Sequence, residues 1–195
     1  MWLIIKCAQT HQRNKIKGAN KMKNLEQYVR SIPNFPEEGI IFRDITTVLQ
    51  DKNGLKLAID SIQDMLKDLD FDIVVGPESR GFIFGVPIAY NLNKGFVPVR
   101  KKGKLPCETV EKEYELEYGT AVIEIHKDAI QPGQKVVIID DLIATGGTIE
   151  AIVELIEQLG GEVVKIAFLM ELEGLEGRKK LTGYDVDAVI KYEGK

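Results

Sequence analysis

The stretch VVIIDDLIATGGT, residues 136–148, joins an apolar strand to the start of a helix. Two carboxylates, Asp140 and Asp141, are expected to end the strand, and a turn of small residues, 144–148, opens the helix. In open α/β sheets, ligands lie beyond the carboxyl ends of the strands, where this turn must lie. Its backbone N–H groups can converge on an anion, helped by the helix dipole. The stretch therefore predicts an α/β sheet that carries a phosphate-binding turn.

The two acids and the turn together predict a site for a 5-phosphoribosyl group. Glycine is needed because a Cβ would keep the backbone away from a phosphate and because such turns often require positive φ. Asp140 and Asp141 can accept hydrogen bonds from vicinal ribose hydroxyls or help to hold magnesium. An ordinary acidic strand end before a glycine-rich helix start is the alternative. The candidate phosphate ligands are Ala144, Thr145, Gly146, Gly147 and Thr148.

Short apolar runs alternate with helical patterns on both sides of this stretch. Such a series predicts an α/β fold, a mainly parallel twisted sheet with helices on both faces. A short helix at 24–31 and an irregular stretch at 34–46 are expected before it. The expected strands are 71–75, 95–99, 135–140, 163–170 and 187–192, and the expected helices are 54–69, 82–92 and 147–159.

A long charged connection follows the strand at 95–99. Its second half, TAVIEIHK at 120–127, alternates like an edge strand. The remainder, about 101–117, is expected to be a mobile loop, and long loops of this kind are often lids over binding sites.

Residues 136–148 closely resemble the phosphoribosyl pyrophosphate motif of the type I phosphoribosyltransferases, in which an apolar strand, two acids and a TGGT-like loop follow one another. The resemblance runs from about Leu25 to Tyr192. It implies one domain over 22–195, with a hood at about 24–48 and a flexible loop at about 101–117. It also implies a homodimer, and Mg²⁺ carried by phosphoribosyl pyrophosphate without direct side-chain ligation.

The stretch GPESRGF, residues 76–82, has the glycine spacing of a Walker loop but lacks the Lys and Ser/Thr that follow. It resembles the pyrophosphate loop of adenine phosphoribosyltransferases. By that likeness Glu78, Ser79 and Arg80 contact pyrophosphate, and the Glu78–Ser79 peptide bond is expected to be cis. The alternative is a surface turn in which Arg80 pairs with Glu78.

The stretch NFPEEGIIFRDIT, residues 34–46, resembles the hood of the same enzymes. There Phe42 would stack on the base while backbone groups of Ile41 and Arg43 hydrogen-bond to its edge, and Leu142 would help to sandwich it. An aromatic between prolines and glycine could equally be core packing. The residues alone do not decide between these roles.

The charged connection resembles the flexible loop of adenine phosphoribosyltransferases at KKGKLP and at YELEYGTA. Lys104 would approach the pyrophosphate, and Glu117, beside Tyr118, would act as general acid and base at the purine. Cys107 and residues 108–115 match no pattern of the family. A solvated loop of mixed charge is the alternative.

The resemblance predicts transfer of the 5-phosphoribosyl group from phosphoribosyl pyrophosphate to adenine, giving AMP and pyrophosphate. Two alternatives stay open. One is a regulator of the same fold that senses nucleotides without catalysis. The other is an enzyme that uses another base, such as xanthine or hypoxanthine.

Charge and composition limit the other partners. Residues 1–21 carry five basic side chains and no acid, and removing them from the formal net charge of −4 leaves −9 for residues 22–195. With this net negative charge, residues 22–195 are expected to bind nucleic acid poorly. No apolar run approaches the length of a membrane span. The two cysteines suggest no disulfide, so a cytoplasmic location is expected. Residues 1–21 are either a targeting segment or, as we favour, an extension upstream of a start at Met22.

Overall fold

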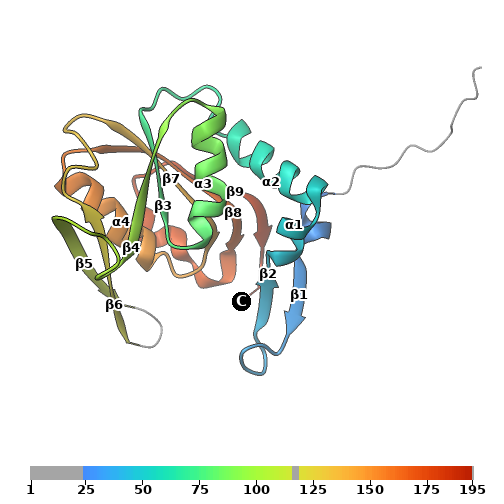
Figure 1. The fold of residues 1–195 in the computed structure, drawn as a ribbon. Helices are drawn as coiled ribbons and strands as arrows, with labels where there is room; N and C mark the ends of the chain where they lie inside the picture. Colours follow the sequence, from blue (N-terminus) through green and yellow to red (C-terminus); the bar gives the residue numbers. More distant parts are fainter. Residues whose placement is uncertain (1–23, 116–118, 195) are drawn as a thin grey trace, which may run out of the picture.

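The computed structural model of the chain describes residues 24–115 and 119–194. Its seven-stranded sheet has the order β5-β6-β4-β3-β7-β8-β9 (Figure 1). The pairs from β4 through β3, β7 and β8 to β9 are parallel, while β6 and β5 join antiparallel at one side. The strands are β3 (Ile73–Pro77), β4 (Gly95–Lys101), β5 (Thr109–Glu115), β6 (Thr120–His126), β7 (Lys135–Ile143), β8 (Glu162–Leu172) and β9 (Val186–Tyr192).

Alternation along the central strands gives the sheet an apolar core on each face. In β7, Val136 and Ile138 pack with α4 (Gly147–Gln158), whereas Val137 and Ile139 pack on the opposite face. That second face is covered by α1 (Thr46–Gln50), α2 (Lys52–Asp64) and α3 (Arg80–Asn91). The sequence prediction of a mainly parallel α/β sheet with helices on both faces is confirmed.

A separate two-stranded hairpin, here called the hood, lies next to the β9 side of the sheet (Figure 1). Of the helix expected at 24–31, only the short 3₁₀ helix η1 (Leu25–Tyr28) forms. The rest of that expectation is wrong, since strand β1 (Arg30–Pro33) begins at Arg30. The irregular stretch expected at 34–46 is wrong over 41–44, where β2 (Ile41–Asp44) pairs antiparallel with β1. Arg30 forms an ion pair with Asp44 directly across the hairpin, and such cross-strand pairs stabilise strands over a local helix.

The mobile loop expected at 101–117 is wrong over 109–115. These residues form β5, which pairs with β6 along its full length, so β5 and not 120–127 is the sheet edge. Glu111, Glu113 and Glu115 are exposed, while Val110 and Tyr114 pack against the core on the α4 side. The exposed glutamates thus alternate with inward residues as a strand requires, but Lys112 interrupts the apolar pattern of the inward face.

Two 3₁₀ helices, η2 (Glu173–Leu175) and η3 (Gly177–Leu181), connect β8 to β9. No helix within residues 24–115 and 119–194 has the length and apolar character needed to cross a membrane.

Candidate active site

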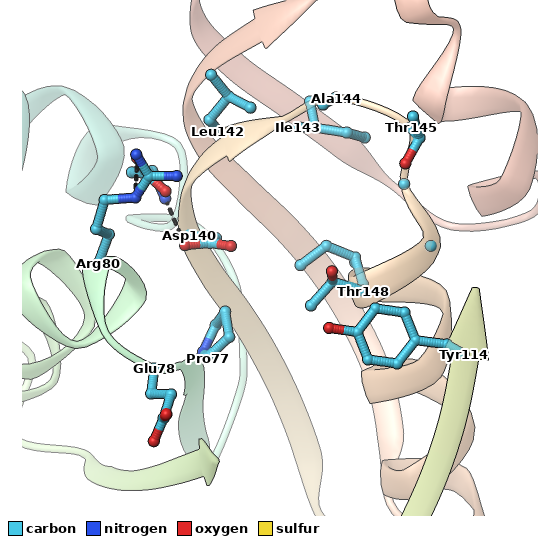
Figure 2. Close-up of a pocket in the computed structure, with 14 residues that line it drawn as sticks. Pro77, Glu78, Arg80, Tyr114, Asp140, Leu142, Ile143, Ala144, Thr145 and Thr148 are labelled. Atoms are coloured by element: carbon cyan, nitrogen blue, oxygen red, sulfur yellow. Dashed lines mark hydrogen bonds and ion pairs between the residues drawn. The ribbon is translucent and has the colours of Figure 1, made fainter. Parts of the chain in front are cut away.

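A cavity of about 260 Å³ opens at the carboxyl ends of β3 and β7 (Figure 2). The sequence suggested that Asp140 and Asp141 end the strand. Strand β7 instead runs on to Ile143, so both aspartates lie within it. In Figure 2, Asp140 lies between Arg80 on one side and the turn from Ala144 to Thr148 on the other. The cavity is lined by Pro77, Glu78, Arg80, Tyr114 and every residue from Asp140 to Ile149.

Residues 144–148, here called the phosphate turn, lead directly into α4. Gly146 has φ +79° and precedes the first helical residue, Gly147. The first N–H groups of a helix have no partner within the helix, so those of this turn are available to an anion. Behind the turn, the backbone of Gly177 in η3 packs so closely that a Cβ on residue 146 would overlap its carbonyl oxygen. The turn is thus held by backbone packing.

The two aspartates differ in their surroundings. Asp141 is buried, and its Oδ2 lies 3.0 Å from Nε of Arg80. The Asp141 amide donates to Oδ1 of Asp140 over 2.8 Å. Burial raises the pKa of Asp140 well above its usual value, and the negative charge of Asp141 adds to this. Burial also raises the pKa of Asp141, while the positive charge of Arg80 opposes the rise.

Arg80 starts α3 and faces the cavity from its N-terminal end. It pairs with Asp141 and not with Glu78, so the surface turn considered from the sequence does not form. Glu78 Oε2 instead accepts a hydrogen bond from Nε of Arg100 over 2.7 Å. The Glu78–Ser79 peptide bond is cis, as expected.

Comparisons with known proteins place this site in a family. The profile of the phosphoribosyl transferase domain matches residues 44–193. The adenine phosphoribosyltransferase of Lachnoclostridium phytofermentans is 80% identical over 174 residues, which are 89% of this chain and 100% of that protein. The chain belongs to the adenine phosphoribosyltransferase family.

Solved structures of the family share the fold. The adenine phosphoribosyltransferase of Thermoanaerobacter pseudethanolicus is 55% identical, with a TM-score of 0.83 over 86% of this chain and 98% of that one. The Saccharomyces cerevisiae enzyme is 42% identical, with a TM-score of 0.79 over 85% and 96%. That structure holds adenine and D-2,5-dideoxy-2,5-imino-altritol 1,6-bisphosphate.

The hood residues do not line the cavity. Ile41, Phe42 and Arg43 lie on β2, and the Phe42 ring is half-buried in an edge contact with the exposed Phe35, their centroids 5.3 Å apart. Phe42 lies outside the two buried core clusters of the described chain. The Arg43 guanidinium lies over the ring of Tyr192, 3.8 Å from its centroid.

The flexible-loop residues of the family are only partly described. Lys104 is exposed and outside the cavity, and its amide donates to Oε1 of the buried Glu124 over 2.8 Å. Glu124 also accepts from the amide of Leu105, so one buried carboxylate fixes the backbone that carries Lys104. Ser79 does not line the cavity, and Glu117 lies outside the described residues.

Sequence reasoning missed Tyr114 and Arg100. Tyr114 reaches the cavity from β5, with its hydroxyl pointing inward beside Thr148 (Figure 2). The alternation of exposed glutamates in 109–115 was the available signal for a strand. No signal connected Arg100 with Glu78.

The described residues contain no group of three or more His, Cys, Asp or Glu side chains placed to hold a metal ion. Asp140 and Asp141 are two carboxylates at the cavity, and Arg80 already neutralises one of them. Magnesium commonly binds through one or two carboxylates, waters and substrate phosphates. This donor set fits a magnesium ion that arrives on a phosphorylated ligand.

Proposed function

We propose that this chain transfers the 5-phosphoribosyl group of phosphoribosyl pyrophosphate to adenine, giving AMP and pyrophosphate in purine salvage. One observation carries the proposal. A single cavity brings together a helix-opening turn suited to a phosphate, two acids suited to ribose hydroxyls and an arginine suited to pyrophosphate. The 80% identity to an adenine phosphoribosyltransferase supports the choice of base.

The phosphate turn, residues 144–148, binds the 5′-phosphate through backbone N–H groups and the hydroxyls of Thr145 and Thr148. Asp140 and Asp141 accept hydrogen bonds from the two ribose hydroxyls and so fix the sugar. Phe42 and Leu142 hold the purine ring, and backbone groups of Ile41 and Arg43 select its edge. Selectivity for adenine rests on those hydrogen bonds, because stacking alone accepts any purine.

The reaction breaks the bond between ribose C1′ and pyrophosphate oxygen as the base nitrogen bonds to C1′. The loop that contains Glu78 and Ser79 binds the departing pyrophosphate together with the side chains of Arg80 and Lys104, whose positive charges stabilise its developing negative charge. Glu117 accepts the proton that the purine nitrogen loses as it bonds to C1′. Magnesium, when bound with the ligand, neutralises phosphate charge. The ribose carries positive charge at C1′ in the transition state. The enzyme contributes by aligning the base nitrogen and the leaving pyrophosphate on opposite sides of C1′ and by stabilising the developing charges.

The test offers adenine, hypoxanthine, guanine, xanthine and uracil separately, with magnesium and phosphoribosyl pyrophosphate, and follows pyrophosphate release. Turnover with adenine alone is the expected result. Turnover with another base would change the substrate, and none with any base would favour a nucleotide sensor. Glu117→Ala should lower kcat far more than it weakens binding of phosphoribosyl pyrophosphate, and equal effects would remove its proton-transfer role.

The proposal includes a homodimer in the cytoplasm. Helix α3 exposes three large apolar residues, Ile83, Val86 and Tyr90, which are 37%, 48% and 85% exposed. Their spacing places them on one helix face, and an apolar face of this kind supports a partner there. Val86→Glu should shift the mass measured by light scattering from dimer to monomer. An unchanged dimer would place the interface elsewhere.

A further inference from the structure

Lys180 lies beside the phosphate turn although it comes from a different part of the chain. It belongs to η3, and its Nζ lies 3.5 Å from the position that a Cβ on Gly147 would occupy. Gly147 lines the cavity, as does Tyr114, whose ring also lies beside this position, while Lys180 stands just outside the lining. The ammonium group is therefore within a few ångströms of the space next to the turn.

The backbone that carries Lys180 is fixed against the turn. A Cβ on Gly177, at the start of η3, would overlap the carbonyl oxygen of Ala144 and lie 3.0 Å from the amide nitrogen of Gly146. The next residue, Arg178, donates from Nε to Oε1 of the buried Glu171 over 2.6 Å. Leu181 closes η3 and is 2% exposed. These contacts fix the backbone that carries Lys180, so only its side chain has to become ordered when a ligand binds.

Acidic side chains outnumber cations in the lining of the cavity. Its charged lining side chains are Glu78, Arg80, Asp140 and Asp141, and Arg80 is already paired with Asp141. A 5′-phosphate on the turn would add further negative charge beside these acids. Backbone N–H groups supply only partial charges, so a full positive charge near Gly147 would add substantially to phosphate binding.

The present partner of Lys180 is weak. Its Nζ lies 3.5 Å from Oε2 of Glu150, and the two side chains are 44% and 42% exposed. Pairs this exposed contribute little to stability, and a phosphate dianion is a stronger partner than a solvated carboxylate. The ammonium can therefore leave Glu150 for a ligand at low cost.

We infer that Lys180 is a phosphate-binding residue of this site, donating from Nζ to an oxygen of the 5′-phosphate held on the turn. The inference rests on the proposed function and adds a residue to it. Lys180 determines affinity for the phosphoribosyl group and takes no part in bond breaking at C1′, because the phosphate oxygens do not react.

The test compares Lys180→Met with Lys179→Met. Lys179 belongs to the same 3₁₀ helix, but its side chain is 73% exposed and pairs with Glu176. Calorimetric titration with ribose 5-phosphate should show binding to Lys180→Met weakened about tenfold or more, the scale of one charge-assisted hydrogen bond. Lys179→Met should bind like the unchanged protein, and Lys180→Arg should recover part of the loss. Equal affinity of both methionine variants would overturn the inference.

Glu150→Gln separates ligand binding from a purely structural ion pair. If Lys180 serves the ligand, freeing it from Glu150 should leave ribose 5-phosphate binding unchanged or tighter. If Lys180 only supports α4 through Glu150, this variant should weaken binding as much as Lys180→Met, and the inference fails. In turnover, Lys180→Met should raise KM for phosphoribosyl pyrophosphate while kcat changes by less than about threefold.

The binding readout does not depend on turnover. If the protein without substitutions binds ribose 5-phosphate but releases no pyrophosphate with any base, the proposed activity is refuted. The comparison of binding to the Lys180 and Lys179 variants would still test the Lys180 inference. Active protein whose Lys180 variants bind and turn over normally would refute the Lys180 inference alone.

Discussion

A methyl group added at residue 146 should disrupt the phosphate turn by two separable effects. Gly146 has φ +79°, which costs an alanine about 1–2 kcal/mol. The new Cβ would also overlap the carbonyl oxygen of Gly177 and lie 3.1 Å from its carbonyl carbon, nearer than ordinary van der Waals contact. Relieving such overpacking typically costs about 1–3 kcal/mol. Gly146→Ala should therefore lower the free energy of unfolding by about 2–5 kcal/mol.

Gly133→Ala is the matched control. Gly133 has φ +82°, and a Cβ there meets no atom within 4 Å, so this variant carries the backbone cost without the overlap. Urea unfolding should give it a loss of only about 1–2 kcal/mol. Its KM for phosphoribosyl pyrophosphate should be unchanged, whereas a displacement of about 1 Å at the turn in Gly146→Ala should reduce kcat/KM by about 100-fold. Equal stability losses and equal KM values would refute the view that Gly177 fixes the turn.

Three further substitutions probe the rest of the cavity. Asp140→Asn should stabilise the fold. Burial raises the pKa of Asp140 above its ordinary value near 3.8, so the folded state becomes less stable as the pH rises from 3.8 through the folded-state pKa and the buried carboxyl ionises. Its advantage in urea unfolding should thus be larger at about pH 8 than at about pH 5, and an advantage that does not grow with pH would contradict this. Arg80→Gln leaves the buried Asp141 carboxylate unpaired, so unfolding should require about 1–3 kcal/mol less and kcat should fall; unchanged stability would show that the 3.0 Å pair contributes nothing. Tyr114→Phe removes a hydroxyl that points into the cavity while the ring packing stays, so KM for phosphoribosyl pyrophosphate should rise about threefold to tenfold at nearly constant stability, and a change in stability alone would refute the contact.

The central layers were predictable because their signals are local. Residues 136–139 are an unbroken apolar run, and α4 repeats Ile149, Ile152, Val153 and Ile156 at helical spacing, all of them buried. A strand buried on both faces and a helix buried on one leave such patterns in consecutive residues. The phosphate turn was found for the same reason, since its strand, glycines and helix are adjacent in the chain.

The secondary structure of the hood was predicted wrongly in part, because it depends on pairing across a loop. Residues 24–31 suggest a helix on their own, but Arg30 pairs with Asp44 and Ile32 lies opposite Phe42. No local pattern shows which residues will meet across such a turn. In β5 the signal was present, yet Lys112 between the outward glutamates obscured it, because a lysine stem can lie along apolar surface while its charge reaches water.

The same limit applies to the candidate site. Asp140, Asp141 and the phosphate turn lie within one short segment and were named together, as was Arg80 in its loop. Tyr114 reaches Thr148 from another strand, and Lys180 reaches Gly147 from η3. Only the order of the sheet and the close contact between Gly177 and Ala144 bring these side chains to the turn.

The position of the cavity follows from the order in which the strands are connected. Strands β3 and β7 are parallel neighbours, but α3 after β3 packs on one face of the sheet while α4 after β7 packs on the other. The starts of both helices therefore open on the crevice between the two strand ends, which is where ligands bind in open α/β sheets. Arg80 stands at one helix start, the phosphate turn at the other, and Asp140 and Asp141 between them. For the proposed substrate this arrangement sets the direction of binding, because acids repel phosphates and accept hydroxyls. The two phosphorylated ends are drawn apart to the helix starts, and the ribose is left over the acids with C1′ toward Arg80.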